Sequence, residues 1–203
     1  MTTIEVFADV SCPFTHVGLR RLVERRQARG ADRTIRVRAW PLELVNGQPL
    51  DAYLIAEEVG ALRTQVAPDL FTGFDPAAFP HTSLPALALT HSAYAIRAEV
   101  GERVALALRW ALFEEGRNIA ALDVLLDIAA SAGIGLPEHC EQDRVRDDWA
   151  EGQRRGVIGS PHFFVGSHDY FCPSLRIDKV DGQLRIADNH DALDSFLADA
   201  LSV

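Results

Sequence analysis

The order of hydrophobic and polar positions changes its period twice along the chain. Residues 3–7 are mostly apolar, which predicts a buried strand, and a helical spacing of apolar positions begins at Phe14. Pro13 suits the first turn of that helix, because its missing N–H would have no helical partner there. Strict alternation over residues 34–40 predicts a second strand with one polar face. The first 40 residues therefore predict a β-α-β unit.

Helical spacing dominates the middle of the chain. Five helices are predicted there, over residues 50–62, 84–100, 102–115, 121–132 and 137–155. The run 104–113 is apolar almost all round, which indicates a helix buried in a bundle. Residues 71–80 are rich in turn residues and aromatics, so they predict a loop that can fold over a site.

The last quarter of the chain returns to strand patterns and ends in an amphipathic helix. The predicted strands, followed by the helix, cover residues 159–166, 170–172, 175–180, 183–186 and 191–201. The whole order predicts an α/β fold that contains an inserted helical bundle. We expect one domain to be formed by residues 1–43 and 157–203, and the inserted helical domain by residues 44–156.

Composition indicates a globular protein that binds neither nucleic acid nor membrane. The 203 residues are 48% hydrophobic and 24% charged, and the net charge of −9 disfavours nucleic-acid binding. No stretch is typical of a transmembrane span or of a secretory signal. Cys12, Cys140 and Cys172 do not make a disulfide framework, so we expect a reducing, cytoplasmic setting. Cysteine and histidine are too scattered to predict a metal site.

Basic residues are concentrated in the first predicted helix and the second strand. Eight of the 20 lie there: Arg20, Arg21, Arg25, Arg26, Arg29, Arg33, Arg36 and Arg38. A solvated helix face explains them. The alternative is a local positive field, which would lower a thiol pKa or attract an anionic small thiol.

Cys12 stands where the first strand ends and the first helix begins. A thiol at the positive end of a helix dipole has a lowered pKa and is a better nucleophile near neutral pH. The alternative is a small buried hydrophobe, the commonest role of a lone cysteine. We interpret Cys12 as the reactive residue, and Cys140, which lies among acidic residues, as structural.

Other polar residues could assist this thiol. His16 follows Cys12 by one helical turn and could accept the thiol proton or hold the thiolate, although an exposed histidine without a role fits equally well. Thr15 shares the first helical turn with Cys12 and could donate a hydrogen bond to a bound thiol, as could Ser83. Asp9 would raise the thiol pKa, so we interpret it as a loop cap.

Three stretches carry a resemblance to a known family. Residues 9–18, Asp-Val-Ser-Cys-Pro-Phe-Thr-His-Val-Gly, are similar to the D-x-x-C-P-W-C-x-x-G signature of FrnE-type proteins. Residues 80–86 look like the P-x-N-[ST]-x-x-A stretch of 2-hydroxychromene-2-carboxylate isomerases and kappa-class glutathione transferases. Residues 156–161 look like the G-V-x-G-x-P stretch before the third strand. The chain thus resembles the DsbA-like group of the thioredoxin superfamily over nearly its whole length.

The resemblance implies a thioredoxin-like α/β fold with an all-helical domain inserted between the second and third strands. It also implies a cis peptide bond before Pro161 that packs against Cys12. The residues then expected to contact the substrate or its thiol are Pro13, Phe14, Ser83, Ser160, Pro161 and His162. For His162 an ordinary strand residue is the alternative.

Thr15 stands where the signature has its second cysteine. A single cysteine forms a mixed disulfide that another thiol must resolve. That thiol could be glutathione or mycothiol, or it could be Cys172 if the fold brings it near Cys12. Alternatively the site has left redox chemistry, as in the isomerases and kappa transferases. Thr82, in place of the Asn of their shared stretch, weakens the isomerase interpretation.

We therefore expect a thiol–disulfide oxidoreductase that acts through Cys12 on protein or small-molecule thiols and disulfides. It would have no tightly bound cofactor and would use glutathione or mycothiol as co-substrate. One alternative is a glutathione-dependent isomerase or transferase, in which Cys12 or Thr15 activates the bound thiol. The other is a non-enzymatic peptide-binding module. A homodimer is left open.

Overall fold

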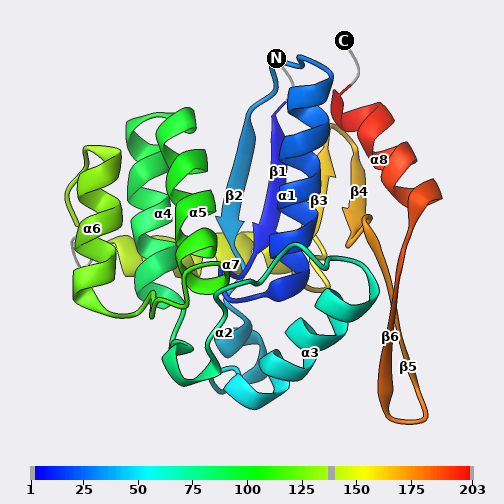
Figure 1. The fold of residues 1–203 in the computed structure, drawn as a ribbon. Helices are drawn as coiled ribbons and strands as arrows, with labels where there is room; N and C mark the ends of the chain where they lie inside the picture. Colours follow the sequence, from blue (N-terminus) through cyan, green and yellow to red (C-terminus); the bar gives the residue numbers. More distant parts are fainter. Residues whose placement is uncertain (1–2, 137–139, 202–203) are drawn as a thin grey trace.

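The computed structural model describes residues 3–136 and 140–201 and has the expected α/β architecture. One four-stranded sheet has the order β2-β1-β3-β4 and is built from β1 Ile4–Ala8, β2 Ile35–Ala39, β3 His162–Val165 and β4 His168–Phe171. β1 and β2 are parallel, whereas β3 is antiparallel to both of its neighbours. Figure 1 shows the sheet in the middle of the molecule, between the helical part and α8.

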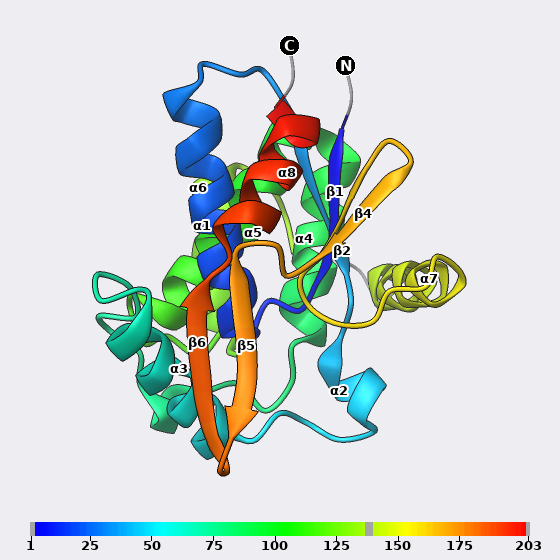
Figure 2. The same cartoon turned by 90° about the vertical axis from the view of Figure 1, so that its right-hand side faces the viewer.

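Helices cover both faces of this sheet. α1 (Pro13–Ala28) and α8 (His190–Leu201) lie on one face, and α7 (Cys140–Arg154) lies on the other (Figure 2). Successive side chains of a strand point to opposite faces. Accordingly, Val6 joins the apolar cluster of α1 and α8, whereas Phe7 packs with Trp40 and Trp149 on the side of α7.

The part of the chain between β2 and β3 is helical. It contains α2 Leu42–Asn46, α3 Ala52–Gln65, the short 3-10 helix η1 Pro76–Ala78, α4 Leu84–Ile96, α5 Ala98–Phe113, α6 Leu122–Ala132 and α7. The predicted insertion of helices between the second and third strands is therefore confirmed. The domain boundaries near residues 44 and 156 remain predictions. No helix in the described ranges is long and apolar enough to cross a membrane.

The boundary between α4 and α5 differs from the predicted one. The sequence places it at Gly101, but the chain leaves helical geometry at Arg97, whose φ and ψ are −161° and 152°. Gly101 lies inside α5 against the ring of Tyr94, where an added Cβ would be 2.2 Å from a ring atom. The glycine is thus required by close packing between the two helices. Tyr94 in turn donates its hydroxyl to the carbonyl of Ile35 on β2, at 2.9 Å.

The predicted hairpin after β4 forms a second, two-stranded sheet. Its strands are β5 Leu175–Val180 and β6 Gln183–Asp188. Gln65 at the end of α3 ties the hairpin to the helical part, since it donates to the carbonyl of Leu184 and accepts from the N–H of Ile186. The hairpin therefore lies against α3, as Figure 2 shows.

Candidate active site

Cys12 is the N-cap residue of α1, directly after the loop that follows β1. Only 3% of its surface is exposed. Its thiol Sγ lies 3.2 Å from the carbonyl oxygen of Ser160, to which it donates. The peptide bond between Ser160 and Pro161 is cis, the geometry that the resemblance implies. The fold therefore brings the N-terminus of α1 and the start of β3 together at the sulfur.

Thr15 completes this contact on the side of α1. Its side chain is fully buried, and its hydroxyl lies 2.8 Å from the hydroxyl of Ser160. The Ser160 hydroxyl also accepts the N–H of Asp9 at 2.9 Å. Pro13, at the first helical position, is buried, and Phe14 is half-buried against the helical core. The first turn of α1 is thus tied to the cis bond by two hydroxyl groups.

The predicted lowering of the thiol pKa is wrong. Burial raises the pKa of Cys12, because the thiolate would lose its hydration. Contacts with Thr15 and Ser160 act in the opposite direction without compensating for burial, and the carboxylate of Glu58 adds to the increase. The position at a helix N-terminus was identified correctly, but it does not by itself make the thiol acidic.

The arginine-rich stretch does not supply the predicted positive field. Arg20, Arg21 and Arg26 of α1 each form an ion pair with a carboxylate, those of Glu24, Asp188 and Glu102 respectively. These carboxylates compensate much of the positive charge of the three arginines, so their electrostatic effect on Cys12 is small. This outcome agrees with the plainer interpretation of a charged, solvated helix face.

Arg109 is the cation that lies beneath the site. It is 1% exposed on α5 and donates to the carbonyl of Asp9 at 3.2 Å. Burial lowers the pKa of this guanidinium to about 10, while the negative charges of Asp9 and Cys12 raise it. Because such coupling is reciprocal, Arg109 favours the thiolate form of Cys12.

Asp9 caps the loop before Cys12, as expected. Its carboxylate accepts the N–H of Ser11 at 2.8 Å, the N–H of Leu42 at 2.7 Å and the hydroxyl of Ser83 at 3.0 Å. Burial raises the pKa of Asp9, and these bonds oppose the increase. Ser83 also donates to Glu43, at 3.1 Å. Ser83 thus holds the loop in place and does not reach toward the thiol.

His16 is held by the helical part. Its Nε2 lies 2.8 Å from Oε1 of Glu114, and its ring packs against Phe71 and Phe113. Glu114 also accepts the backbone N–H groups of Phe71 and Thr72, at 2.8 and 3.0 Å. Burial lowers the pKa of His16. These contacts favour a positioning role for His16, and its predicted role as a proton acceptor stays a prediction.

Phe71 adopts an unusual backbone conformation at this contact. Its φ is 63°, a region in which bulky residues are rare, and its side chain is 1% exposed. The predicted loop over residues 71–80 therefore folds down onto His16 and the end of α5. Gly73 and Gly116 meet there so closely that an added Cβ on either would overlap the opposite backbone.

Cys172 follows β4 and is 6% exposed. Its N–H donates to the carbonyl of Pro161 at 3.0 Å, so it lies on the other side of the cis bond from Cys12. Both cysteines are free thiols. Burial raises the pKa of Cys172 to about 12, and the negative charge of Cys12 contributes to that increase. The two thiols therefore affect each other electrostatically, and burial disfavours the thiolate form of both.

His162 is occupied by structural contacts. It is 3% exposed, its Nε2 lies 2.9 Å from Asp169, and its Nδ1 accepts the N–H of Ile158 at 3.3 Å. Its ring stacks on Phe164. Both ring nitrogens thus serve β3 and its surroundings, which agrees with an ordinary strand residue. The predicted structural role of Cys140 stays a prediction, because its side chain lies outside the described part of the chain.

Sequence reasoning missed three charged residues around the site, namely Glu58, Arg109 and Glu114. Glu58 and Arg109 were visible as charges within apolar patterns. Glu58 shares the face of α3 that buries Ile55 and Leu62, and Arg109 interrupts the apolar run of α5. A charge in such a stripe indicates a buried role. Glu114 has no comparable signal, because its partners come from a distant loop.

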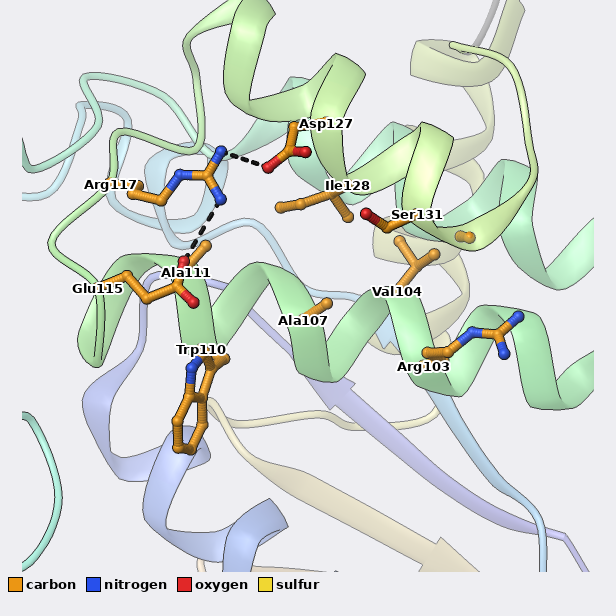
Figure 3. Close-up of a pocket in the computed structure, with 11 residues that line it drawn as sticks. Arg103, Val104, Ala107, Trp110, Ala111, Glu115, Arg117, Asp127, Ile128 and Ser131 are labelled. Atoms are coloured by element: carbon orange, nitrogen blue, oxygen red, sulfur yellow. Dashed lines mark hydrogen bonds and ion pairs between the residues drawn. The ribbon is translucent and has the colours of Figure 1, made fainter.

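A separate groove of about 380 Å³ lies between α5 and α6. Figure 3 shows Arg117 bridging Asp127 of α6 and Glu115, which follows α5, at one end of the groove, while Arg103 lies at the other end. None of its lining residues contacts Cys12 or the cis bond by a hydrogen bond. The groove is therefore not part of the candidate active site. No cluster that could hold a metal ion occurs in the described residues.

A family model described as DSBA-like thioredoxin domain matches residues 3–185. No curated protein matches the chain in sequence. Among solved structures, the cytosolic disulfide reductase DsbM from Pseudomonas aeruginosa aligns with a TM-score of 0.63 and 20% identity, covering 96% of this chain and 98% of DsbM. A second structure of DsbM, with GSH, aligns equally well.

A 2-hydroxychromene-2-carboxylate isomerase is also similar in structure, with a TM-score of 0.64 and 15% identity. The alignment covers 83% of this chain and 88% of the isomerase. At these identities the structural likeness shows a common fold and does not choose between redox and isomerase chemistry.

Proposed function

This chain belongs to the DSBA-like thioredoxin domain family, and from that membership we propose that it is a thiol–disulfide oxidoreductase with Cys12 as its reactive residue. The observation that carries the proposal is the position of the Cys12 sulfur. Cys12 is the N-cap residue of α1, and its sulfur touches the carbonyl of Ser160 beside the cis bond. A substrate sulfur that attacks or is attacked there meets the backbone of two elements at once.

The proposed reaction has two balanced steps. In the first, the Cys12 thiolate attacks a disulfide R–S–S–R′, so that a bond forms between Cys12 and R–S while R′–S⁻ leaves and takes up a proton. In the second, the thiolate of a small thiol attacks the R sulfur and releases the Cys12 thiolate. These two steps at Cys12 release R′–SH and leave R–S joined to the small thiol in a mixed disulfide. A second molecule of the small thiol then displaces R–S⁻ from that mixed disulfide, which completes reduction of the substrate and oxidises the small thiol to its own disulfide.

The environment of Cys12 supports the reducing direction. An oxidising thiol protein has a strongly stabilised thiolate, whereas burial destabilises the thiolate of Cys12. A less stable thiolate gives up electrons more readily and favours the mixed disulfide. Arg109 and the hydroxyl of Thr15 provide the remaining stabilisation that the nucleophile needs.

An external small thiol, glutathione or mycothiol, is the proposed resolving partner. Burial raises the pKa of Cys172 as it does that of Cys12, and the two thiols are not joined in a disulfide, so Cys172 is kept as the alternative resolving thiol. The structural neighbour DsbM has been solved with GSH, which supports a thiol of this class. The structural neighbour DsbM is described as cytosolic, which supports a cytoplasmic setting.

Turnover of a small disulfide tests the proposal. With glutathione as reductant and bis(2-hydroxyethyl) disulfide as substrate, we expect steady reduction by the wild-type protein and by Cys172→Ser. Cys12→Ser should reduce the rate to the uncatalysed background. Equal turnover by Cys12→Ser and the wild-type protein would overturn the proposal.

A glutathione-dependent isomerase is the second candidate. The pair of hydroxyls at Thr15 and Ser160 favours it, because two hydroxyls 2.8 Å apart could hold a thiolate without forming a disulfide. In that case Cys12→Ser would keep the isomerase activity, and Thr15→Val would lose it. Comparison of Cys12→Ser with Thr15→Val therefore decides between the two candidate functions.

A further inference from the structure

Glu58 is a carboxylate without a partner beside the candidate active site. It lies on α3 between Ile55 and Leu62, which are buried on the same face, and it is itself half-buried. Within the described residues it forms no hydrogen bond and no ion pair. Burial raises the pKa of its carboxyl group to about 7. Above pH 7 the ionised carboxylate is half-buried without a partner in the protein, which is costly, so a cation supplied from outside would stabilise it.

The face of α3 that carries Glu58 packs beside the reactive sulfur. Ile55, Val59 and Leu62 of this face share one apolar cluster with Val10 and Val17, which flank Cys12 along the chain. The negative charge of Glu58 accordingly contributes to the raised pKa of Cys12. The carboxylate therefore opposes formation of the thiolate for as long as it is ionised and unpaired. Any cation that pairs with Glu58 removes this opposition.

The surroundings of Glu58 leave this position open to an external cation. α3 packs against α1, β6 and η1. The charged and titratable groups of these elements are His16, Arg20, Arg21, Glu24, Arg25, Arg26, Arg185, Asp188 and, at the start of η1, Asp75. Four of the cationic or titratable groups are already paired: His16, Arg20, Arg21 and Arg26. In the described part of the chain none of the nine forms an ion pair with Glu58.

We propose that Glu58 binds a cationic group of the substrate, an ammonium or guanidinium a few bonds from the disulfide, and so selects disulfides that carry a positive charge next to the sulfur. The inference rests on the proposed thiol–disulfide exchange and names its substrate class. Binding and activation are coupled, because the cation that pairs with Glu58 also relieves the charge that opposes the Cys12 thiolate.

Three small disulfides of different charge test this selection. Cystamine is cationic, bis(2-hydroxyethyl) disulfide is neutral and dithiodiglycolate is anionic. The rate of mixed-disulfide formation at Cys12 is measured for the wild-type protein, for Glu58→Gln and for Glu57→Gln. Glu57 is the matched control, because it is the exposed carboxylate next to Glu58 on the same helix. Differences in intrinsic reactivity between the probes cancel when the variants are compared.

We expect the wild-type ratio of cystamine to neutral disulfide to exceed that of Glu58→Gln by about tenfold at low salt. Glu57→Gln should keep the wild-type ratio. The preference should shrink in salt, and it should decline as the pH falls through about 7, since Glu58 is then protonated. Dithiodiglycolate should react faster with Glu58→Gln than with the wild-type protein.

Disulfide dimers of the peptides Gly-Cys-Lys and Gly-Cys-Gln separate the two sources of such a cation. Faster reaction with the lysine dimer than with the glutamine dimer identifies a basic peptide as the source of the cation. A charge preference seen with cystamine but not with the peptides identifies a small aminothiol. Either result supports the proposal. An equal charge preference in all three proteins would overturn it. It would also be overturned if Glu58→Gln changed the rates of all probes by one factor. Failure of the wild-type protein to react with any probe would instead overturn the proposed function.

Discussion

The hydroxyl of Thr15 lies 2.8 Å from the hydroxyl of Ser160. Thr15, which replaces the second cysteine of the family signature, therefore contacts the residue that precedes the cis bond. The same serine accepts the thiol hydrogen of Cys12 through its carbonyl, at 3.2 Å. Helix α1 and the start of β3 thus share one serine, and the thiol chemistry depends on it.

Removal of the Thr15 hydroxyl should weaken the nucleophile. Thr15→Val keeps the shape but loses contacts that lower the pKa of Cys12, so that pKa should rise and less thiolate should form at pH 7. We expect slower alkylation of Cys12 by iodoacetamide and a loss of about 1 kcal/mol in unfolding free energy. Thr90→Val, which removes a buried hydroxyl bonded within α4, is the control. A Cys12 alkylation rate equal to that of wild type would contradict this role.

Replacement of Thr15 by cysteine should change the mechanism. Positions 12 and 15 share the first turn of α1, so Thr15→Cys restores a pair of thiols at the spacing of the family signature. On treatment with glutathione disulfide we expect an internal disulfide, seen by mass as loss of the two thiol hydrogens. Thr15→Ser should still form an adduct. A stable adduct on Thr15→Cys would show that the site cannot close its own disulfide.

Glu114 should stabilise the fold over the site. Its carboxylate joins His16 to the backbone of Phe71 and Thr72, and Glu114→Gln weakens these bonds. We expect a loss of about 1–3 kcal/mol in urea unfolding. Glu115→Gln, which removes an exposed carboxylate one residue away, should change stability by less than about 0.5 kcal/mol. Equal effects of the two substitutions would contradict the special role of Glu114.

The same carboxylate should make stability depend on acidity. Hydrogen bonds from His16, Phe71 and Thr72 outweigh burial and lower the pKa of Glu114 from 4.5 to about 2. Its contribution is then complete above about pH 4.5 and is lost as the pH falls toward 2. The urea midpoint of wild type should fall across this window more steeply than that of Glu114→Gln. Parallel curves would show that Glu114 titrates normally.

Local signals explain why much of the fold could be predicted. The alternation of residues 34–40, the proline at position 13 and the turn residues Asp181 and Gly182 act through their immediate neighbours. The family resemblance adds the cis bond and the position of the helical insertion. Where a local signal has two meanings the prediction was wrong, as at Gly101, which serves helix packing rather than a helix end.

The environment of the thiol could not be predicted, because distant residues create it. The dipole of α1 is a local property, but the burial that raises the pKa of Cys12 comes from the contacts at Ser160 and the surrounding elements. His16 resembles an exposed residue of an arginine-rich helix until α5 and the turn at Phe71 cover it. Glu58 and Arg109 were visible in the sequence as charges among apolar positions of predicted helices, but they were not singled out.

The intact mass of the reduced protein after exposure to glutathione disulfide is the most direct measurement. We expect one glutathionyl group on the wild-type protein and on Cys172→Ser, and none on Cys12→Ser. Addition of free glutathione should remove the group. Loss of two hydrogens without an adduct, abolished in Cys172→Ser, would make Cys172 the resolving thiol. An adduct that persists in Cys12→Ser would contradict the central role of Cys12.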